Sequence, residues 1–378
     1  MQKIIIQSRL SHRLRSLLVS TWIMAGTLVR RALGRPLVAQ WPFLVEYSTL
    51  YVRAQFNHAF RLSRNIGASR AYFDSVYGLL ETFPDVDVRP TGTGEPRGHW
   101  FVPQVRHSEA TMLYLHGGGY TFYAGISHHF VACLAHYLGV TVFAPDYRLT
   151  PEHPHPAQLE DALAAYRYVL GRGVAPSTLV LGGDSAGGHL ALMTLSQLRQ
   201  ADLPPPALTL GLSPWTDIGL RGKSQFGNDR YDLVQGYMTL QFAQWLKGGQ
   251  DLSDAALSPI CQDFRHLGPI YLQAGGKEIL VDMIRDFAST VAAQGAGVRL
   301  DVWEHMVHEF HGYGNCIPES RDALTRLREA IAWALNQPHS FAADARTECD
   351  HLSLTCNPGA APACSACTPP TSTAPANP

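Results

Sequence analysis

The chain lacks several features that would place it in a disulfide-stabilised, nucleic-acid-binding or lipid-anchored class. It has only seven cysteines, an odd number, and four of them fall within the last thirty residues, so no disulfide framework holds the main body. The formal net charge of -1 gives no global attraction to nucleic acid. Lipid-anchoring motifs are absent. We therefore expect a cytoplasmic protein with no nucleic-acid partner.

Long hydrophobic runs are absent near the N-terminus. The apolar stretch at residues 16–29 is shorter than the roughly 20 residues that span a bilayer. A basic segment precedes it, as in a cleaved signal peptide, but Arg30 and Arg31 follow directly and no clear small-residue cleavage site is present. We expect instead an amphipathic helix that packs on the protein or lies against a membrane surface.

Charge is distributed unevenly along the chain. Between Met1 and Phe73, eleven lysine and arginine residues stand against a single acid, Glu46. A basic segment of this kind is attracted to anionic lipid. Peripheral membrane contact through the N-terminus is therefore expected. This contact would be separate from the function of the central region.

Composition divides the chain into three regions. Residues 1–80 form a basic, helix-like segment, which we expect to be part of a cap. Residues 81–337 hold the alternating patterns of a catalytic domain, and the 46% apolar content of the chain is ample for a core. Residues 338–378 are rich in proline, alanine, serine and threonine and are predicted to be a disordered, low-complexity tail.

Strand and helix patterns alternate through the middle region. Most strand candidates are continuously apolar, as strands covered on both faces are. This pattern predicts an α/β fold with a mostly parallel sheet, helices on both faces and chemistry at the carboxyl ends of strands. The interval at residues 217–255 is too long for a simple loop and is predicted to be a cap insertion. The strand candidates are residues 85–90, 98–104, 111–117, 140–148, 177–184, 207–214, 269–276 and 298–305.

Four glycines crowd around Ser185. The run from Gly183 to Gly187 fits G-x-S-x-G, in which a serine stands on a strained turn between a strand and a helix with its hydroxyl exposed. Glycines two residues to either side allow the chain to reverse without a collision of side chains. Ser185 is therefore the candidate nucleophile, and Asp184 is expected to be a helix-start residue.

A serine hydroxyl needs a general base, and that base needs an orienting acid. In folds of this class the acid and then the histidine follow later strands. His308 is the candidate base, with His305 and His311 as competitors in the same turn. Glu278 is the candidate acid because it comes first after its strand, with Asp282 as the alternative.

The tetrahedral intermediate also needs hydrogen-bond donors for its negative oxygen. Three glycines follow His116 at the end of a strand and leave backbone N–H groups unshielded. Gly117 and Gly118, together with the N–H of Ala186, are the predicted oxyanion hole. His116 is expected to brace the loop.

Four motifs in order resemble the hormone-sensitive lipase family of α/β-hydrolases, the bacterial type IV esterases. They are HGGG at 116–119, GDSAGG at 183–188, DYRLTPEHP at 146–154 and SPWTD at 213–217, and the resemblance covers residues 80–336. It implies an α/β-hydrolase core, a helical cap, no metal or cofactor, and hydrolysis of short to medium acyl esters. Many relatives place an aspartate in a D-P-L context where this chain has Glu278, which looks like a glutamate variant of the family.

The favoured hypothesis is a serine carboxylesterase that passes through an acyl-enzyme. A deacetylase or amidase acting on an acylated metabolite would use the same residues, and a non-catalytic ligand receptor is the third hypothesis because a fold alone does not determine function. The expected partners are a small-molecule acyl ester, a membrane surface at the N-terminus and a second copy of the chain in a homodimer.

Overall fold

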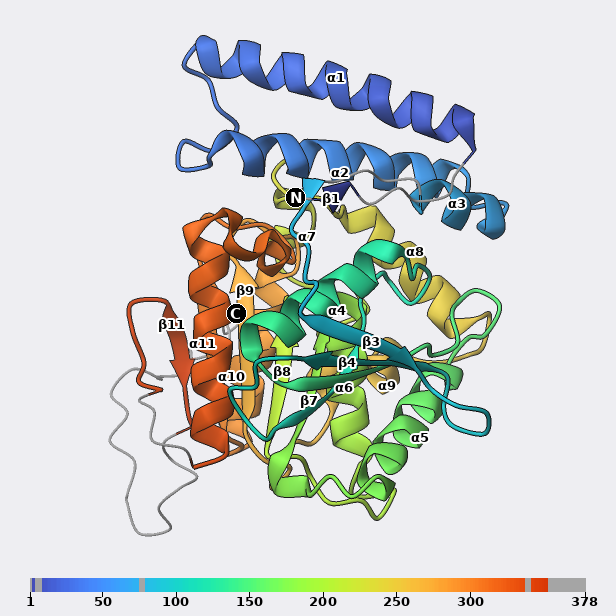
Figure 1. Ribbon diagram of the computed structural model, residues 1–378, viewed down its shortest axis with the longest axis vertical. Helices are drawn as coiled ribbons and strands as arrows, with labels where there is room; N and C mark the ends of the chain where they lie inside the picture. The colour runs from blue at the N-terminus through green and yellow to red at the C-terminus, as the bar shows by residue number, and fades with distance from the viewer. Residues whose placement is uncertain (1, 4–8, 75–78, 337–340, 353–378) are drawn as a thin grey trace, which may run out of the picture.

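A nine-stranded sheet forms the centre of the molecule (Figure 1). The computed structural model describes residues 2–3, 9–74, 79–336 and 341–352. Every strand candidate is present, and the spatial order of the sheet is β11-β10-β9-β8-β7-β5-β6-β4-β3. The strands are β3 (Val86–Pro90), β4 (Gly98–Pro103), β5 (Thr111–Leu115), β6 (Thr141–Pro145), β7 (Leu179–Asp184), β8 (Leu208–Leu212), β9 (Ile270–Gly275), β10 (Val298–Trp303) and β11 (Thr347–Asp350).

The sheet is parallel from β6 through to β10 and antiparallel at both margins. Its inner strands β5, β7, β8, β9 and β10 are buried along their whole length, which explains their continuously apolar sequences. The parallel strands all end at one edge, so the loops after β5, β7, β9 and β10 meet there. The predicted α/β-hydrolase fold is confirmed.

Helices cover both faces of the sheet, and each face has its own apolar core. On one face lie α4 (Gly125–Leu138) and α11 (Pro318–Ala334). On the other lie α5 (Ala157–Gly171), α6 (Ser185–Gln197) and α10 (Val281–Ala293). The interval at residues 217–255 contains α7 (Ser224–Gly227) and α8 (Gly236–Lys247), and the short elements are β1 (Gln2–Lys3), which pairs with β2 (Leu79–Leu80), α9 (Asp254–Leu257), η1 (Pro176–Thr178), η2 (Pro259–Cys261) and η3 (Phe310–Cys316).

Three N-terminal helices lie over the edge of the domain where the loops after β5, β7, β9 and β10 gather. They are α1 (Leu10–Ala32), α2 (Phe43–Arg61) and α3 (Ile66–Phe73). Figure 1 shows α1 lying over α2, on the side of α2 away from the sheet. Apolar side chains of α2 and α3 join the same core as the sheet, so these two helices are part of the folded domain.

The seam between α1 and α2 is largely polar. Ser16 and Ser20 of α1 form hydrogen bonds with the hydroxyls of Tyr51 and Tyr47, at 2.5 and 2.6 Å. Nearby, the carboxylate of Glu46 is fully buried, and Arg30 and Arg31 of α1 bind its two oxygens at 3.1 and 3.0 Å. The only acid between Met1 and Phe73 is thereby neutralised inside the seam.

The opposite face of α1 is apolar and exposed, which inverts the usual polarity of a surface helix. Trp22 is 80% exposed and Leu18 70%. Leu10, Leu14, Leu17, Met24, Leu28 and Val29 of α1 are each at least 40% exposed as well. We call the side chains of Leu10, Leu14, Leu17, Leu18, Trp22, Met24, Leu28 and Val29 the outer face of α1.

The predicted start of a disordered tail at residue 338 is wrong for part of that region. β11 pairs antiparallel with β10 and forms the edge of the sheet. The buried guanidinium of Arg299 binds Asp350 at 2.9 Å and lies 4.2 Å from the ring centre of Phe341. Because a buried guanidinium without a counter-charge is strongly destabilising, Asp350 of β11 stabilises Arg299 in β10. Residues 353–378 lie outside the described residues.

Candidate active site

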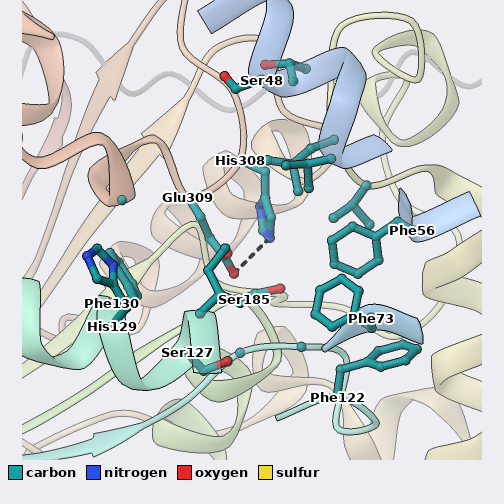
Figure 2. A pocket seen from close by; sticks show the side chains of 18 of the residues that line it. Ser48, Phe56, Phe73, Phe122, Ser127, His129, Phe130, Ser185, His308 and Glu309 are labelled. Carbon is teal, nitrogen blue, oxygen red and sulfur yellow. Dashed lines mark ion pairs between the residues drawn. The ribbon is translucent and has the colours of Figure 1, made fainter. Parts of the chain in front are cut away.

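A cavity of about 730 Å³ lies above the carboxyl edge of the sheet. Ser185 and His308 line it together, and its volume falls within the about 300–1,000 Å³ of ordinary ligand pockets. Figure 2 shows Phe56, Phe73 and Phe122 gathered on one side of Ser185, and Ser127, His129 and Phe130 on the other. The site is therefore a mostly apolar chamber with a few polar groups at its base.

Ser185 stands on a sharp turn between β7 and α6. Its φ of 51° lies in the left-handed region, which side chains rarely adopt. A Cβ on Gly183 would collide with the carbonyl of Gly187, and one on Gly187 would collide with the carbonyl of Leu115. The flanking glycines thus allow α6 to press against β5, as G-x-S-x-G predicts.

His308 and Glu278 come from the turns after β10 and β9 and meet in the interior. Nδ1 of His308 lies 3.6 Å from Oε2 of Glu278, and both side chains are buried. The other ring nitrogen of His308 faces the chamber that holds Ser185 (Figure 2). The structure thus brings together the three residues that the sequence predicts as nucleophile, base and acid.

The competing residues lie elsewhere. His305 is partly exposed, and its backbone carbonyl accepts a hydrogen bond from the indole of Trp41. His311 is buried, and its Nε2 pairs with Oε1 of Gln273 at 2.9 Å. Asp282 accepts hydrogen bonds from the backbone of Lys223 and Ser224 at 2.8 and 2.9 Å, which ties α10 to the start of α7. The geometry therefore favours His308 and Glu278.

The predicted oxyanion hole changes in one member. The backbone N–H of Gly117 donates to both carboxylate oxygens of Asp184, each at 3.0 Å, so it is already engaged. The prediction for Gly117 is therefore wrong in this structure. Gly118, at φ 101°, and Ala186, in the first turn of α6 where N–H groups lack helical acceptors, remain the candidate donors.

His116 braces the glycine loop through its ring. The imidazole stacks between Tyr123 and Tyr147, with ring centres 3.8 and 4.2 Å away, and its Nδ1 lies 2.7 Å from the carbonyl of Gly117. Burial lowers the pKa of His116 to about 3, so it is neutral at ordinary pH.

Two further carboxyl groups that the sequence did not single out for chemistry meet beside the triad. Asp184 makes no side-chain cap for α6; its Oδ1 instead accepts a 2.6 Å hydrogen bond from the hydroxyl of Tyr114. Burial, and then the neighbouring Glu309, raise the pKa of Asp184 well above its ordinary value. Burial opposes the charge of Glu309 as well, but His308 lowers the pKa of Glu309. Each carboxyl group thus influences the charge of the other, while the hydrogen bonds from Tyr114 and Gly117 favour the charged form of Asp184.

Glu309 gives His308 a second acidic neighbour. Its Oε1 lies 3.5 Å from Nε2 of His308, the nitrogen on the side opposite Glu278 (Figure 2). Burial opposes a charge on His308, but Glu309 and Glu278 together raise its pKa well above the ordinary value. The two carboxylates therefore favour the protonated imidazole, whereas the ring acts as a base only in its neutral form.

Asp232, from the interval at residues 217–255, holds the two triad turns together. One of its oxygens accepts the N–H of Ile279 at 2.7 Å and the other accepts the N–H of His308 at 3.1 Å. Burial raises the pKa of Asp232 to about 7. Its signal in the sequence is weak, because an acid in a long loop is usually a solvated residue.

One cluster of the described residues has the composition of a metal site. His99, His128 and Asp146 bring ligand atoms within 4.8 Å of one another. His128 stacks on Tyr123 with ring centres 4.7 Å apart, and Tyr123 stacks in turn on His116. The cluster thus lies outside the chamber and supplies no group to the serine chemistry.

Comparison with known proteins agrees with this geometry. Residues 112–312 match the family described as the alpha/beta hydrolase fold. A solved esterase from the bacterial hormone-sensitive lipase family is 31% identical, with a TM-score of 0.69 over 75% of this chain and 97% of the other. The chain belongs to the hormone-sensitive lipase family of α/β-hydrolases.

Curated relatives extend the comparison to sequence. An acetyl-hydrolase of Streptomyces hygroscopicus is 35% identical over 65% of this chain and 83% of its own length. A carboxylesterase of Mycobacterium tuberculosis is 31% identical over 74% of this chain and 93% of its own length. The resemblance that the four motifs carry is confirmed, and the α/β-hydrolase core of this member extends from β3 to β11.

Replacing Glu309 tests its effect on the base. Besides Glu309, the groups that face His308 are Glu278, Asp232 and His311, and all three stay in Glu309→Gln. Loss of the Glu309 charge lowers the pKa of His308, so its neutral form persists to lower pH. The acidic limb of the kcat/KM profile for a soluble ester is expected to move down by about 1 pH unit or more.

Glu304→Gln is the matched control, because the Glu304 side chain is 84% exposed and faces His305 instead. Its profile should coincide with that of the wild type. An acidic limb that stays in place in Glu309→Gln would show that Glu309 does not set the protonation of His308.

Proposed function

We propose that this protein is a serine carboxylic ester hydrolase. The observation that carries the proposal is the placement of Ser185, on its strained turn, in one chamber with a histidine that a buried glutamate contacts. Membership of a family whose relatives are named esterase, carboxylesterase and acetyl-hydrolase supports it.

The residues divide the reaction between them. Ser185 Oγ forms a bond to the ester carbonyl carbon while its proton passes to neutral His308. Gly118 and Ala186 donate N–H groups to the oxygen that becomes negative. His308 then gives the proton to the departing alcohol as the ester C–O bond breaks. Water repeats the sequence on the acyl-enzyme and releases the acid, while Glu278 orients the imidazole throughout.

Single substitutions test the assignment with p-nitrophenyl acetate and butyrate. Ser185→Ala is expected to lower kcat by about 10³-fold or more, because the nucleophile is lost. Ser127→Ala is the matched control, since Ser127 lines the same chamber without a place in the triad (Figure 2). It should retain most of the wild-type rate. Equal hydrolysis by Ser185→Ala and wild type would refute the proposal.

The N-terminal segment is proposed to make peripheral contact with anionic membrane. Among the described residues, no helix is long and apolar enough to cross a bilayer. Instead, α1 combines its exposed apolar outer face with exposed arginines, Arg9 and Arg15 at one end and Arg35 beyond the other. A helix with this pattern lies in the interface between headgroups and acyl chains.

Sedimentation with phosphatidylglycerol-containing vesicles tests this contact. Wild type is expected to sediment with the vesicles, less so at high salt, and the double variant Leu18→Asp, Trp22→Asp is expected to stay in solution. Leu220→Asp is the control, because Leu220 is 72% exposed but lies outside α1. Equal sedimentation of the double variant and the wild type would refute membrane contact through α1.

A further inference from the structure

The chamber above Ser185 extends far beyond the reacting groups. Its lining includes Leu44, Val52 and Phe56 of α2 and continues to Leu14, Leu17 and Met24 of α1. The α2 wall from Leu44 to Phe56 is about 18 Å long at 1.5 Å per residue, the length of an extended alkyl chain of about fourteen carbons. A short acyl group would leave most of this space unfilled.

The far end of the cavity coincides with the outer face of α1. Leu14, Leu17 and Met24 line the cavity and are also 52%, 61% and 40% exposed. Residues that belong to both surfaces mark a place where the cavity opens. One mouth therefore lies within the outer face of α1, and the exposed lining residues Gly312 and Cys316 mark a second opening near η3.

We propose that α1 lies in the surface of an anionic bilayer and that a long-chain acyl ester enters from the bilayer through the mouth within the outer face to reach Ser185. The inference rests on the proposed hydrolase function and names its substrate class. An acyl chain that moves from the bilayer interior to the Phe56, Phe73 and Phe122 wall passes between apolar surroundings and needs little exposure to water.

Charge distinguishes a lipid surface from other occupants of the outer face. Residues 9–45 contain arginines but no aspartate or glutamate, and the first acid, Glu46, is buried against Arg30 and Arg31. Two copies of so basic a helix would repel each other across a dimer interface. The C-terminal segment 353–378 has a single large apolar residue, Leu354, and so lacks the side chains to cover eight apolar ones.

The route is tested by narrowing it at Val52 in the full-length protein. We compare p-nitrophenyl acetate in solution with p-nitrophenyl palmitate in phosphatidylglycerol-containing vesicles. Val52→Trp is expected to lower kcat/KM for palmitate by about tenfold or more and to leave acetate within about twofold, because only the long chain reaches this wall. Val105→Trp, at an exposed position outside the cavity, is the matched control and should behave as wild type.

The outcomes separate the route from the reaction. If wild type cleaves acetate but not palmitate, or if Val52→Trp leaves the ratio of the two unchanged, the route is refuted and the hydrolase proposal stands. If neither ester is cleaved, the hydrolase proposal itself fails.

If Val52→Trp lowers hydrolysis of both esters, an inhibition experiment with the wild-type protein tests the route instead. A hexadecyl ether, which cannot be hydrolysed, is expected to inhibit acetate hydrolysis by the wild type competitively when supplied in the same vesicles. The outer-face double variant should escape this inhibition. Absence of inhibition in the wild type would overturn the route.

Discussion

The close approach of helix α6 to the end of strand β5 is the constraint on which the catalytic centre depends. Side chains at Gly183 or Gly187 would collide with backbone carbonyls at this contact. With glycine at both positions, the chain reverses within one residue and Ser185 takes a φ of 51°, a conformation that costs about 1–3 kcal/mol and persists only where the surroundings enforce it. This strained conformation places Ser185 beside the glycine loop that follows β5.

Asp184 carries this constraint outward. It binds Tyr114 and Gly117 on one side and meets Glu309 on the other, so one buried carboxyl group links the nucleophile turn, the glycine loop and the histidine turn. Asp232 performs the corresponding task between the acid turn and the histidine turn. His308 therefore lies between two carboxyl groups, with Glu278 near one ring nitrogen and Glu309 near the other. Both acids raise the pKa of His308, so they oppose the neutral form that a general base needs.

The sequence predicts the sheet and the proximity of Ser185, His308 and Glu278 because each residue follows a recognisable apolar strand. It misses Glu309 and Asp232 because an acid in a loop looks the same whether it is solvated or buried. It assigns Gly117 to the oxyanion hole because a run of glycines in the sequence does not show which acceptor each backbone N–H meets. It ends the domain before β11 because that strand is polar, and its stability comes from Arg299, a partner about fifty residues away. Local sequence patterns do not show which charged residues, far apart in the chain, will pair in the folded structure.

The central claim is that the site makes the hydroxyl of Ser185 nucleophilic. Covalent labelling tests this claim most directly. A fluorophosphonate probe should add a single phosphonyl group to the wild-type protein, located by peptide mass spectrometry at Ser185. His308→Ala should abolish labelling while Ser185 remains present, because the hydroxyl then lacks its base. Labelling at another residue, or equal labelling of Ser185 without His308, would contradict the account.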